Sequence, residues 1–167
     1  HSITIASGVG NPYFSVKFTG LGIDIGKHSI GHGGSFKDMS PGQLKVKIHK
    51  FHFQLMADLM KKLEAVPEGD GSMLDNTVIV YLSDAAEAHH SRCGQWPFVL
   101  IPGKNTGLQG GRYLDFPHYM QDGHREIGNL YTTLLHAAGE RREYFGVRDA
   151  MLKGVARGDG PLEALLA

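Results

Sequence analysis

The sequence predicts an α/β fold, and three features support this class. A helix with a marked start begins at Ser40, a continuous apolar run covers Thr77 to Leu82, and the run PFVLIPG covers residues 97–103. Short runs rich in β-branched and aromatic residues are typical of strands buried on both faces. A helix that leads into two such strands predicts a sheet with helices on its faces.

The first forty residues predict little regular structure. The stretch SITIASG, residues 2–8, is rich in β-branched residues and favours a short strand. Residues 8–40 are rich in glycine and predict an irregular segment, with one apolar patch around Phe14, Val16 and Phe18.

The long helix has the clearest local signals. Ser40 is a favourable N-cap, Pro41 suits the first helical position, and Gln43 completes a capping box. Pro67 and the run PEGDGS end the helix. The apolar positions repeat every 3.6 residues and predict a stripe that faces a core: Ile48, Phe51, Leu55, Met56, Leu59, Met60 and Leu63.

A further helix is predicted from about His124 to Ala138. Gly139 provides a stop signal at its carboxyl end. The residues expected to face inward are Ile127, Leu130, Leu134 and Leu135.

Length and composition restrict the class of protein. The chain has 167 residues, which predicts a single α/β domain over residues 1–167 with a hydrophobic core. A formal net charge of zero gives no reason to expect a nucleic-acid partner, and no apolar run is long enough to span a membrane. The single cysteine, Cys93, excludes a disulfide within the chain.

The amino end predicts a piece of a longer protein. The first residue is a histidine, the next residues already favour an ordered element, and no signal peptide opens the chain. We therefore expect an N-terminal region of the same protein upstream of His1.

The stretch GIDIGKHSIGHGG, residues 22–34, is a candidate metal site. Asp24, His28 and His32 follow one another at intervals of four residues, so that the acid and the imidazoles can converge on one cation. The neighbouring glycines allow the backbone to approach an ion closely. The same residues also fit a polar surface loop. Because such spacings arise by chance in many chains, the spacing alone favours the loop.

A second candidate follows the predicted strand at Thr77–Leu82. Asp84 comes directly after this strand, with His89 and His90 a few residues further on. Ligands bind beyond the carboxyl ends of strands in open α/β sheets, and carboxylate with imidazole suits a divalent cation. The alternative is that Asp84 caps a turn and that the two histidines are solvated.

The remaining histidines give weaker signals. His49 and His52 lie three residues apart on the long helix, where ordinary helical histidines are the simpler interpretation. His118, His124 and His136 fall in or near the last helix, and His124 stands at its predicted start. Cys93 has no activating pattern around it and is interpreted as a small passive residue.

Taken together, these segments resemble a known superfamily. An Asp-x3-His pair, a helix, and an apolar strand ending in Ser-Asp resemble the metal-binding half of the alkaline phosphatase, sulfatase and phosphoglycerate mutase enzymes. The blocks LGIDIGKHSIGHGG, LMKKLEAVPEGDGSMLDNTVIVYLSD, HHSRCGQWPFVLIPGKNTGLQGGRYL and NLYTTLLHAAGERREYFG more closely resemble the C-terminal part of a family of exported proteins of unknown function from planctomycetes and related bacteria. The resemblance covers residues 20–147.

This resemblance implies a fold and a set of ligands. It implies a partial three-layer α/β/α sheet like the C-terminal half of the alkaline phosphatase fold. Asp24 and His28 fall on the Asp-x3-His pair, Asp84 falls on the strand-end aspartate, and His89 or His90 could supply the later histidine. Ala85 stands where the superfamily has a histidine. The nucleophile would lie upstream of this chain.

Three functions follow from the sequence and the resemblance. The first is metal-assisted hydrolysis of a phosphate or sulfate ester with zinc, manganese or calcium, in which this chain alone would be inactive. The second, favoured by Ala85, is a non-catalytic domain that binds a glycan or a cell-surface partner. The third is a structural domain stable only beside the rest of its protein. The resemblance also implies a periplasmic or secreted location.

Overall fold

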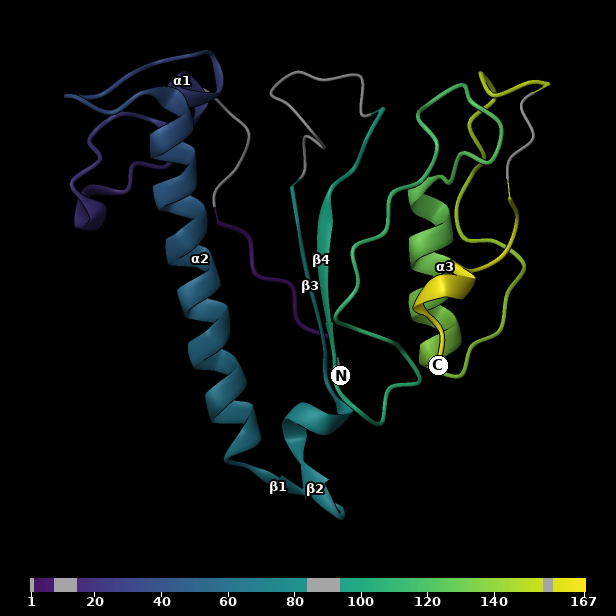
Figure 1. Cartoon of the computed structure of the whole chain (residues 1–167). Helices are drawn as coiled ribbons and strands as arrows, with labels where there is room; N and C mark the ends of the chain where they lie inside the picture. Colours follow the sequence, from purple (N-terminus) through teal and green to yellow (C-terminus); the bar gives the residue numbers. More distant parts are fainter. Residues whose placement is uncertain (1, 8–14, 84–93, 155–157) are drawn as a thin grey trace. The chain divides into compact units, whose positions relative to one another are not determined.

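The computed structural model describes residues 2–7, 15–83, 94–154 and 158–167. The described chain is mixed α/β, with a few helices and small sheets, which agrees with the predicted class (Figure 1). Its helices and strands are α1 (Lys27–Gly31), α2 (Pro41–Glu64), β1 (Pro67–Glu68), β2 (Gly71–Ser72), β3 (Val78–Leu82), β4 (Phe98–Pro102) and α3 (Ile127–Ala137). Short 3-10 turns are η2 (Thr19–Leu21), η3 (Met73–Asn76) and η4 (Glu163–Leu165).

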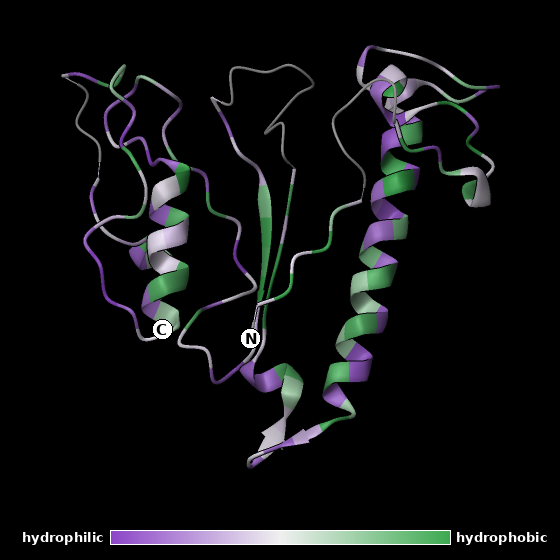
Figure 2. Ribbon diagram, turned by 180° about the vertical axis from the view of Figure 1, so that it is seen from behind, coloured by the Kyte–Doolittle hydropathy of each residue, from purple (hydrophilic) through white to green (hydrophobic). Residues whose placement is uncertain are grey.

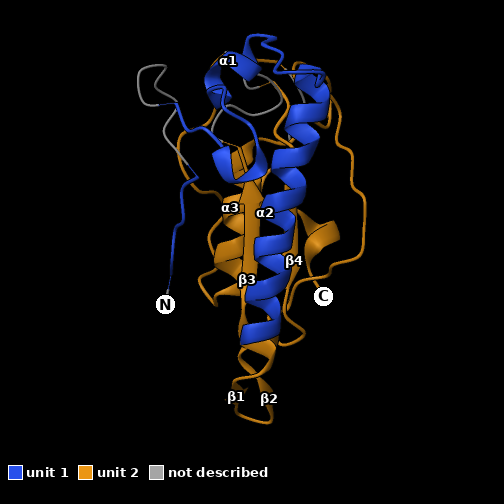
Figure 3. Cartoon of the chain, turned by 90° about the vertical axis from the view of Figure 1, so that its left-hand side faces the viewer, with its two compact units in different colours: residues 1–62, 88–91 blue, residues 63–87, 92–167 orange. Residues whose placement is uncertain are grey.

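The chain divides into two compact units (Figure 3). Unit 1 contains residues 1–62 and 88–91, and unit 2 contains residues 63–87 and 92–167. Unit 1 therefore holds α1 and nearly all of α2, whereas unit 2 holds the strands and α3. No helix in the described ranges combines the length and the hydrophobicity that crossing a membrane requires.

The core of unit 1 joins the glycine-rich segment to the start of α2. Ile23 and Ile30 are fully buried, and they pack with Leu44 and Ile48 of α2. Phe18 lies against this cluster and is half-buried. The segment that the sequence predicts to be irregular is thus part of a folded core and contains the helical turn α1.

The start of α2 confirms the predicted capping box. The Ser40 backbone N–H donates to Gln43 Oε1 at 2.8 Å, and the Gln43 N–H donates to Ser40 Oγ at 3.3 Å. The helix begins at Pro41, whose missing N–H is not needed at this position. Local chemistry therefore fixes the first turn of α2.

The predicted inward stripe of α2 is only partly correct. Ile48 is buried as expected, but the prediction is wrong for Phe51, Leu55 and Leu59, whose side chains are exposed. Hydrophobic and hydrophilic residues alternate along the whole helix (Figure 2). Leu44 and Ile48 are the only α2 residues in the buried cluster of unit 1. The apolar stripe of α2 therefore extends beyond this core.

Strands β3 and β4 of unit 2 occupy the two predicted apolar runs. They pair antiparallel, with Val78 opposite Pro102 and Leu82 opposite Phe98. The prediction of burial on both faces is wrong, because every residue of β3 is half-buried. Only one partner is hydrogen-bonded to each strand in the described chain, and a two-stranded sheet covers less surface than a larger one.

Several polar contacts involve the residues just before β3 and just after β4. Asp75 Oδ2 accepts hydrogen bonds from the Ser72 N–H at 2.8 Å and from Lys104 Nζ at 3.0 Å, which lower the pKa of the Asp75 carboxyl. The Gly103 N–H donates to the Thr77 carbonyl at 2.8 Å. A Cβ atom on Gly103 would lie 2.2 Å from the Leu74 carbonyl oxygen, so only glycine fits here.

Helix α3 begins three residues later than predicted, at Ile127, and ends before Gly139 as expected. Glu126 is the N-cap in an extended conformation, and its N–H donates to Asn129 Oδ1 at 2.8 Å. Gly139 has a φ of 84°, the left-handed conformation that commonly ends a helix. His124 therefore precedes the helix rather than starting it.

The buried face of α3 is partly polar. Asn129, Thr132 and Thr133 are fully buried beside Leu130. Asn129 Nδ2 donates to the carbonyl oxygens of Gly158 and Gly160 at 3.0 and 2.8 Å. These bonds attach the C-terminal segment to α3.

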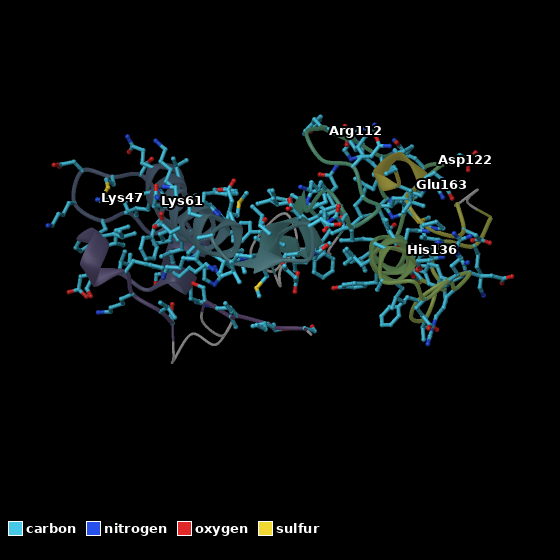
Figure 4. All side chains as sticks on the ribbon, turned by 90° about the horizontal axis from the view of Figure 1, so that it is seen from below. Lys47, Lys61, Arg112, Asp122, His136 and Glu163 are labelled. Carbon is cyan, nitrogen blue, oxygen red and sulfur yellow. The ribbon has the colours of Figure 1, made fainter. Side chains whose placement is uncertain are left out.

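The C-terminal segment also packs on α3 through apolar contacts. Leu130 forms a buried cluster with Leu162 and Leu165, and Ile127 and Leu134 pack against it. Leu165 belongs to η4, which lies beside α3 (Figures 1 and 4). Three of the predicted inward residues of α3 thus contribute to this cluster.

The predicted strand at residues 2–8 does not form over the described residues 2–7. Ile3 and Ile5 are exposed, and no strand pairs with this segment in the described chain. A strand needs a neighbouring strand to accept its hydrogen bonds, and a β-branched composition cannot provide one.

Candidate functional site

The segment of residues 22–34 is held in place by contacts of α1 and of the residues just before it. Ile23 and Ile30 anchor it in the core of unit 1. The His28 N–H donates to Ser15 Oγ at 2.8 Å. A Cβ atom on Gly26 would lie 2.8 Å from the same oxygen, so this glycine allows the close approach of Ser15. The backbone at His28 is therefore tied to Ser15 and to the core of unit 1.

His28 and His32 lie side by side at the carboxyl end of α1. Their Nε2 atoms are 3.2 Å apart, and their ring centroids are 4.8 Å apart at an interplanar angle of 66°. His28 is half-buried and His32 is exposed. Two imidazoles on one tetrahedral zinc ion, with Zn–N bonds of about 2.0–2.1 Å, place their nitrogens about 3.3 Å apart. The distance therefore fits a hydrogen bond between the two rings, and it also fits two ligands of one zinc ion.

Asp24 is not brought to this pair. Its Oδ1 atom forms an ion pair with Lys17 Nζ at a distance of 2.9 Å. The Asp24 side chain is 64% exposed. Among the described residues, no group of three or more histidine, cysteine, aspartate or glutamate side chains could hold a metal ion. Of the three candidates in this segment, the structure thus brings together two.

The candidates of the second predicted site, Asp84, His89 and His90, lie outside the described residues, as does Cys93. The predicted meeting of Asp24 and His28 with Asp84 therefore stays a prediction.

His49 and His52 are placed by the packing of unit 1. His52 is buried, its Nε2 lies 3.0 Å from Ser7 Oγ, and its ring meets the edge of Phe18 at a centroid distance of 5.6 Å. Burial lowers the pKa of His52, and the positive charge of Lys27 lowers it further. Burial, followed by Lys27, lowers the pKa of His49 in the same way. His52 is therefore a core histidine with a polar partner.

The remaining histidines serve the loops of unit 2. Gln95 Nε2 donates to His118 Nδ1. His124 Nδ1 donates to the Pro117 carbonyl at 3.0 Å, and His136 Nε2 donates to the Arg142 carbonyl at 2.8 Å. These contacts fix backbone segments around α3 (Figure 4 labels His136).

Unit 2 also contains an open pocket that no sequence pattern predicts. Its volume is about 370 Å³, and its lining includes His124, Trp96 and Tyr119. His124 is the one lining residue that the sequence marks as a candidate. A usable signal was the only tryptophan of the chain, followed by several tyrosines between residues 113 and 144.

No protein-family model matches this chain, and neither a curated protein nor a solved structure shows detectable similarity to it.

Proposed function

We propose that this chain is a divalent-cation-binding domain of a longer protein related to the phosphate- and sulfate-ester hydrolases. The observation that supports this function is the His28–His32 pair, with Nε2 atoms 3.2 Å apart on a fixed backbone. Neutral imidazole is a common ligand of zinc and of neighbouring divalent metals. A site of this kind needs further ligands beyond two histidines.

The resemblance of the sequence suggests where these ligands come from. In this proposal His89 or His90, the later histidine of the resemblance, completes the coordination. Asp24 would contribute only if its ion pair with Lys17 were broken. The strands β3 and β4 would belong to a larger three-layer α/β/α sheet. Their consecutive apolar residues, from Val78 to Leu82 and from Phe98 to Pro102, are in keeping with that fold.

In the longer protein, the chemistry would be ester hydrolysis in a periplasmic or secreted location. A bound divalent cation supplies Lewis-acid polarisation of a phosphoryl or sulfuryl oxygen. The residues of this chain would hold that ion and orient it, whereas the nucleophile would come from the upstream region. This chain alone is expected to bind metal without hydrolysing an ester.

The test is a metal titration of protein first stripped with a chelator. Zinc, manganese and calcium are added separately, and binding is followed by calorimetry and by the melting temperature. We expect zinc to bind stoichiometrically and to raise the melting temperature, because a ligand that binds only the folded state stabilises it. His28→Ala and His32→Ala should each weaken zinc binding about 100-fold or more, since even residues behind a ligand contribute about 10–100-fold.

Two further variants sharpen this titration. His49→Ala removes an exposed histidine of the same unit and should leave zinc affinity unchanged. Asp24→Asn should weaken binding less than either variant of the histidine pair, because Asp24 is engaged by Lys17. Unchanged melting of the parent protein at saturating zinc, or equal effects of the His49 and His28 variants, would refute the proposal.

A further inference from the structure

The open pocket of unit 2 lies at the amino end of α3. The N-cap Glu126 and the helix residues Ile127, Gly128 and Tyr131 line it, and the other lining residues come from segments before and after α3. Its volume of about 370 Å³ falls in the range of small-molecule sites. The residues that give it chemical character are Trp96, Tyr119, Tyr131, Tyr144, Glu126 and Asp149.

The aromatic walls of this pocket are held in fixed orientations. Trp96 Nε1 donates to the Ser83 carbonyl at 2.7 Å. The Tyr119 hydroxyl donates to Asp149 Oδ2 at 2.6 Å. Tyr131 meets the edge of Phe145 at a centroid distance of 5.6 Å. Rings that are already oriented lose little freedom when a ligand binds.

Gly128, a lining residue of the pocket, lets one more ring come close to the helix. A Cβ atom on Gly128 would lie 2.3 Å from the Tyr144 hydroxyl oxygen, so only glycine leaves room for this tyrosine. The Arg148 guanidinium lies 4.1 Å from the centre of the Tyr144 ring. The structure thus already contains one cation on an aromatic face at this wall.

The charge of the lining is negative. Glu126 and Asp149 are its only carboxylate side chains, and no lysine or arginine lines the pocket. Of the nearby arginines, Arg148 pairs with Asp159 at 2.6 Å and lies 3.9 Å from Glu126. The amino end of α3 adds only about half a positive charge. A cation in the pocket therefore meets two carboxylates and several aromatic faces.

The hydrogen bonds of the carboxylates favour a cation over a sugar. Asp149 accepts from the Tyr119 hydroxyl and, at 2.8 Å, from the Met151 N–H. Glu126 Oε1 accepts from the Asp149 N–H at 2.7 Å. A sugar needs acceptors for its hydroxyl groups, and here protein donors already use both oxygens of Asp149 and Oε1 of Glu126. Their negative charge remains, and aromatic faces with negative charge recognise quaternary ammonium groups.

We infer that this pocket binds a small organic ammonium cation, which lies against the aromatic walls and near Glu126 and Asp149. This site is independent of the proposed metal site, because all of its residues belong to unit 2 and His28 and His32 belong to unit 1.

Trp96 allows a direct test, since it is the only tryptophan of the chain. The full chain is titrated with choline at constant ionic strength, and Trp96 emission is recorded. The neutral compound 3,3-dimethylbutan-1-ol, which has the same shape, is titrated in parallel. We expect a saturable response to choline and binding of the neutral compound weaker by about 5-fold or more.

Variants assign the response to the pocket. Asp149→Asn and Tyr131→Leu should each weaken choline binding several-fold, whereas Tyr131→Phe should keep it because the aromatic face remains. Tyr113→Leu is the matched control, since Tyr113 is 91% exposed and does not line the pocket. Melting curves identify any variant that fails to fold. If Tyr131→Leu fails to fold, the choline affinities of Tyr131→Phe and Asp149→Asn are compared instead.

Three results would overturn the inference. The first is no saturable response to choline in the parent protein. The second is equal affinity for choline and for the neutral compound, which would leave the carboxylates without a role. The third is a saturable response to a disaccharide such as maltose but not to choline, which would assign the pocket to sugars.

Discussion

The helices α2 and α3 show two different ways of holding a helix in place. α2 has 24 residues, yet only Leu44, Ile48 and His52 are buried. α3 has 11 residues, of which five are buried, and three of these five are polar. Helix length and apolar periodicity therefore do not measure how firmly a helix is attached. The side chains of α3 bond to distant backbone, and this gives the shorter helix the stronger attachment.

The largest effect is expected from truncating the apolar centre of α3. Leu130→Ala removes a fully buried side chain from the cluster with Leu162 and Leu165. It should lower the free energy of unfolding of unit 2 by about 2–5 kcal/mol. Urea unfolding followed by Trp96 emission measures it. The same change at the exposed Leu59 of α2 should have an effect below about 1 kcal/mol, and equal effects would remove the contrast between the helices.

The next effect tests the polar face of α3. Asn129→Leu keeps the volume of the side chain but removes two donated bonds and one accepted bond. We expect a loss of about 2–4 kcal/mol, because buried carbonyl and N–H groups lose their partners. The matched variant is Gln54→Leu on α2, whose bond to Asp58 is exposed and contributes a few tenths of a kcal/mol at most.

If Asn129→Leu unfolds at the same urea concentration as the parent protein, the hydrogen bonds to Gly158 and Gly160 do not stabilise unit 2. The attachment of the C-terminal segment would then rest on Leu162 and Leu165 alone.

A smaller effect is expected at the start of α2. Ser40→Ala removes the side-chain half of the capping box, in which Ser40 Oγ accepts from the Gln43 N–H. The expected loss is about 1 kcal/mol, with more fraying of the first turn in far-UV circular dichroism. Ser40→Asn should keep most of the stability, since asparagine also caps helices well.

The smallest effect is a dependence of unit 1 on pH. The pKa values of His49 and His52 are lowered, first by burial and then by Lys27, so the unfolded chain binds protons more readily than the folded one. Stability is then fully present above the ordinary histidine pKa of about 6.5 and is lost as the pH falls through the lowered values.

The melting of α2 at about pH 7.5 and about pH 5 measures this dependence. His52→Leu should reduce the difference between the two melting temperatures. A melting temperature that rises toward acid pH would contradict the direction of both shifts.

The sequence was most informative where a short segment decides its own structure. The capping box at Ser40, the stop at Gly139 and the apolar runs of β3 and β4 need only neighbouring residues, and all four are found in the structure. A few residues suffice because the relevant hydrogen bonds and dihedral angles are local.

Features that depend on distant contacts were not predictable in the same way. Periodicity placed Phe51 toward a core because it cannot tell how far that core extends. The burial of Asn129 depends on carbonyl groups about 30 residues away in the chain. The sequence of α3 contains no pattern that predicts these partners.

The candidate sites also differ in whether they depend on local or on distant contacts. The four-residue spacing of His28 and His32 predicts their proximity, since residues four apart meet on one side of a helical turn. The engagement of Asp24 by Lys17 comes from the packing of the preceding segment, and the aromatic pocket collects residues from 96 to 149. Such arrangements follow from the tertiary fold.

The contacts around Asp75 and Gly103 have a consequence for engineering. They hold the start of β3 beside the end of β4, and the connection from Leu82 to Phe98 lies at the opposite end of the strand pair. Because the register is already fixed at the end near Asp75 and Gly103, substitutions in the two strands near Leu82 and Phe98 should not shift their pairing. That half of the hairpin could therefore be redesigned, provided that Asp75 and Gly103 are kept.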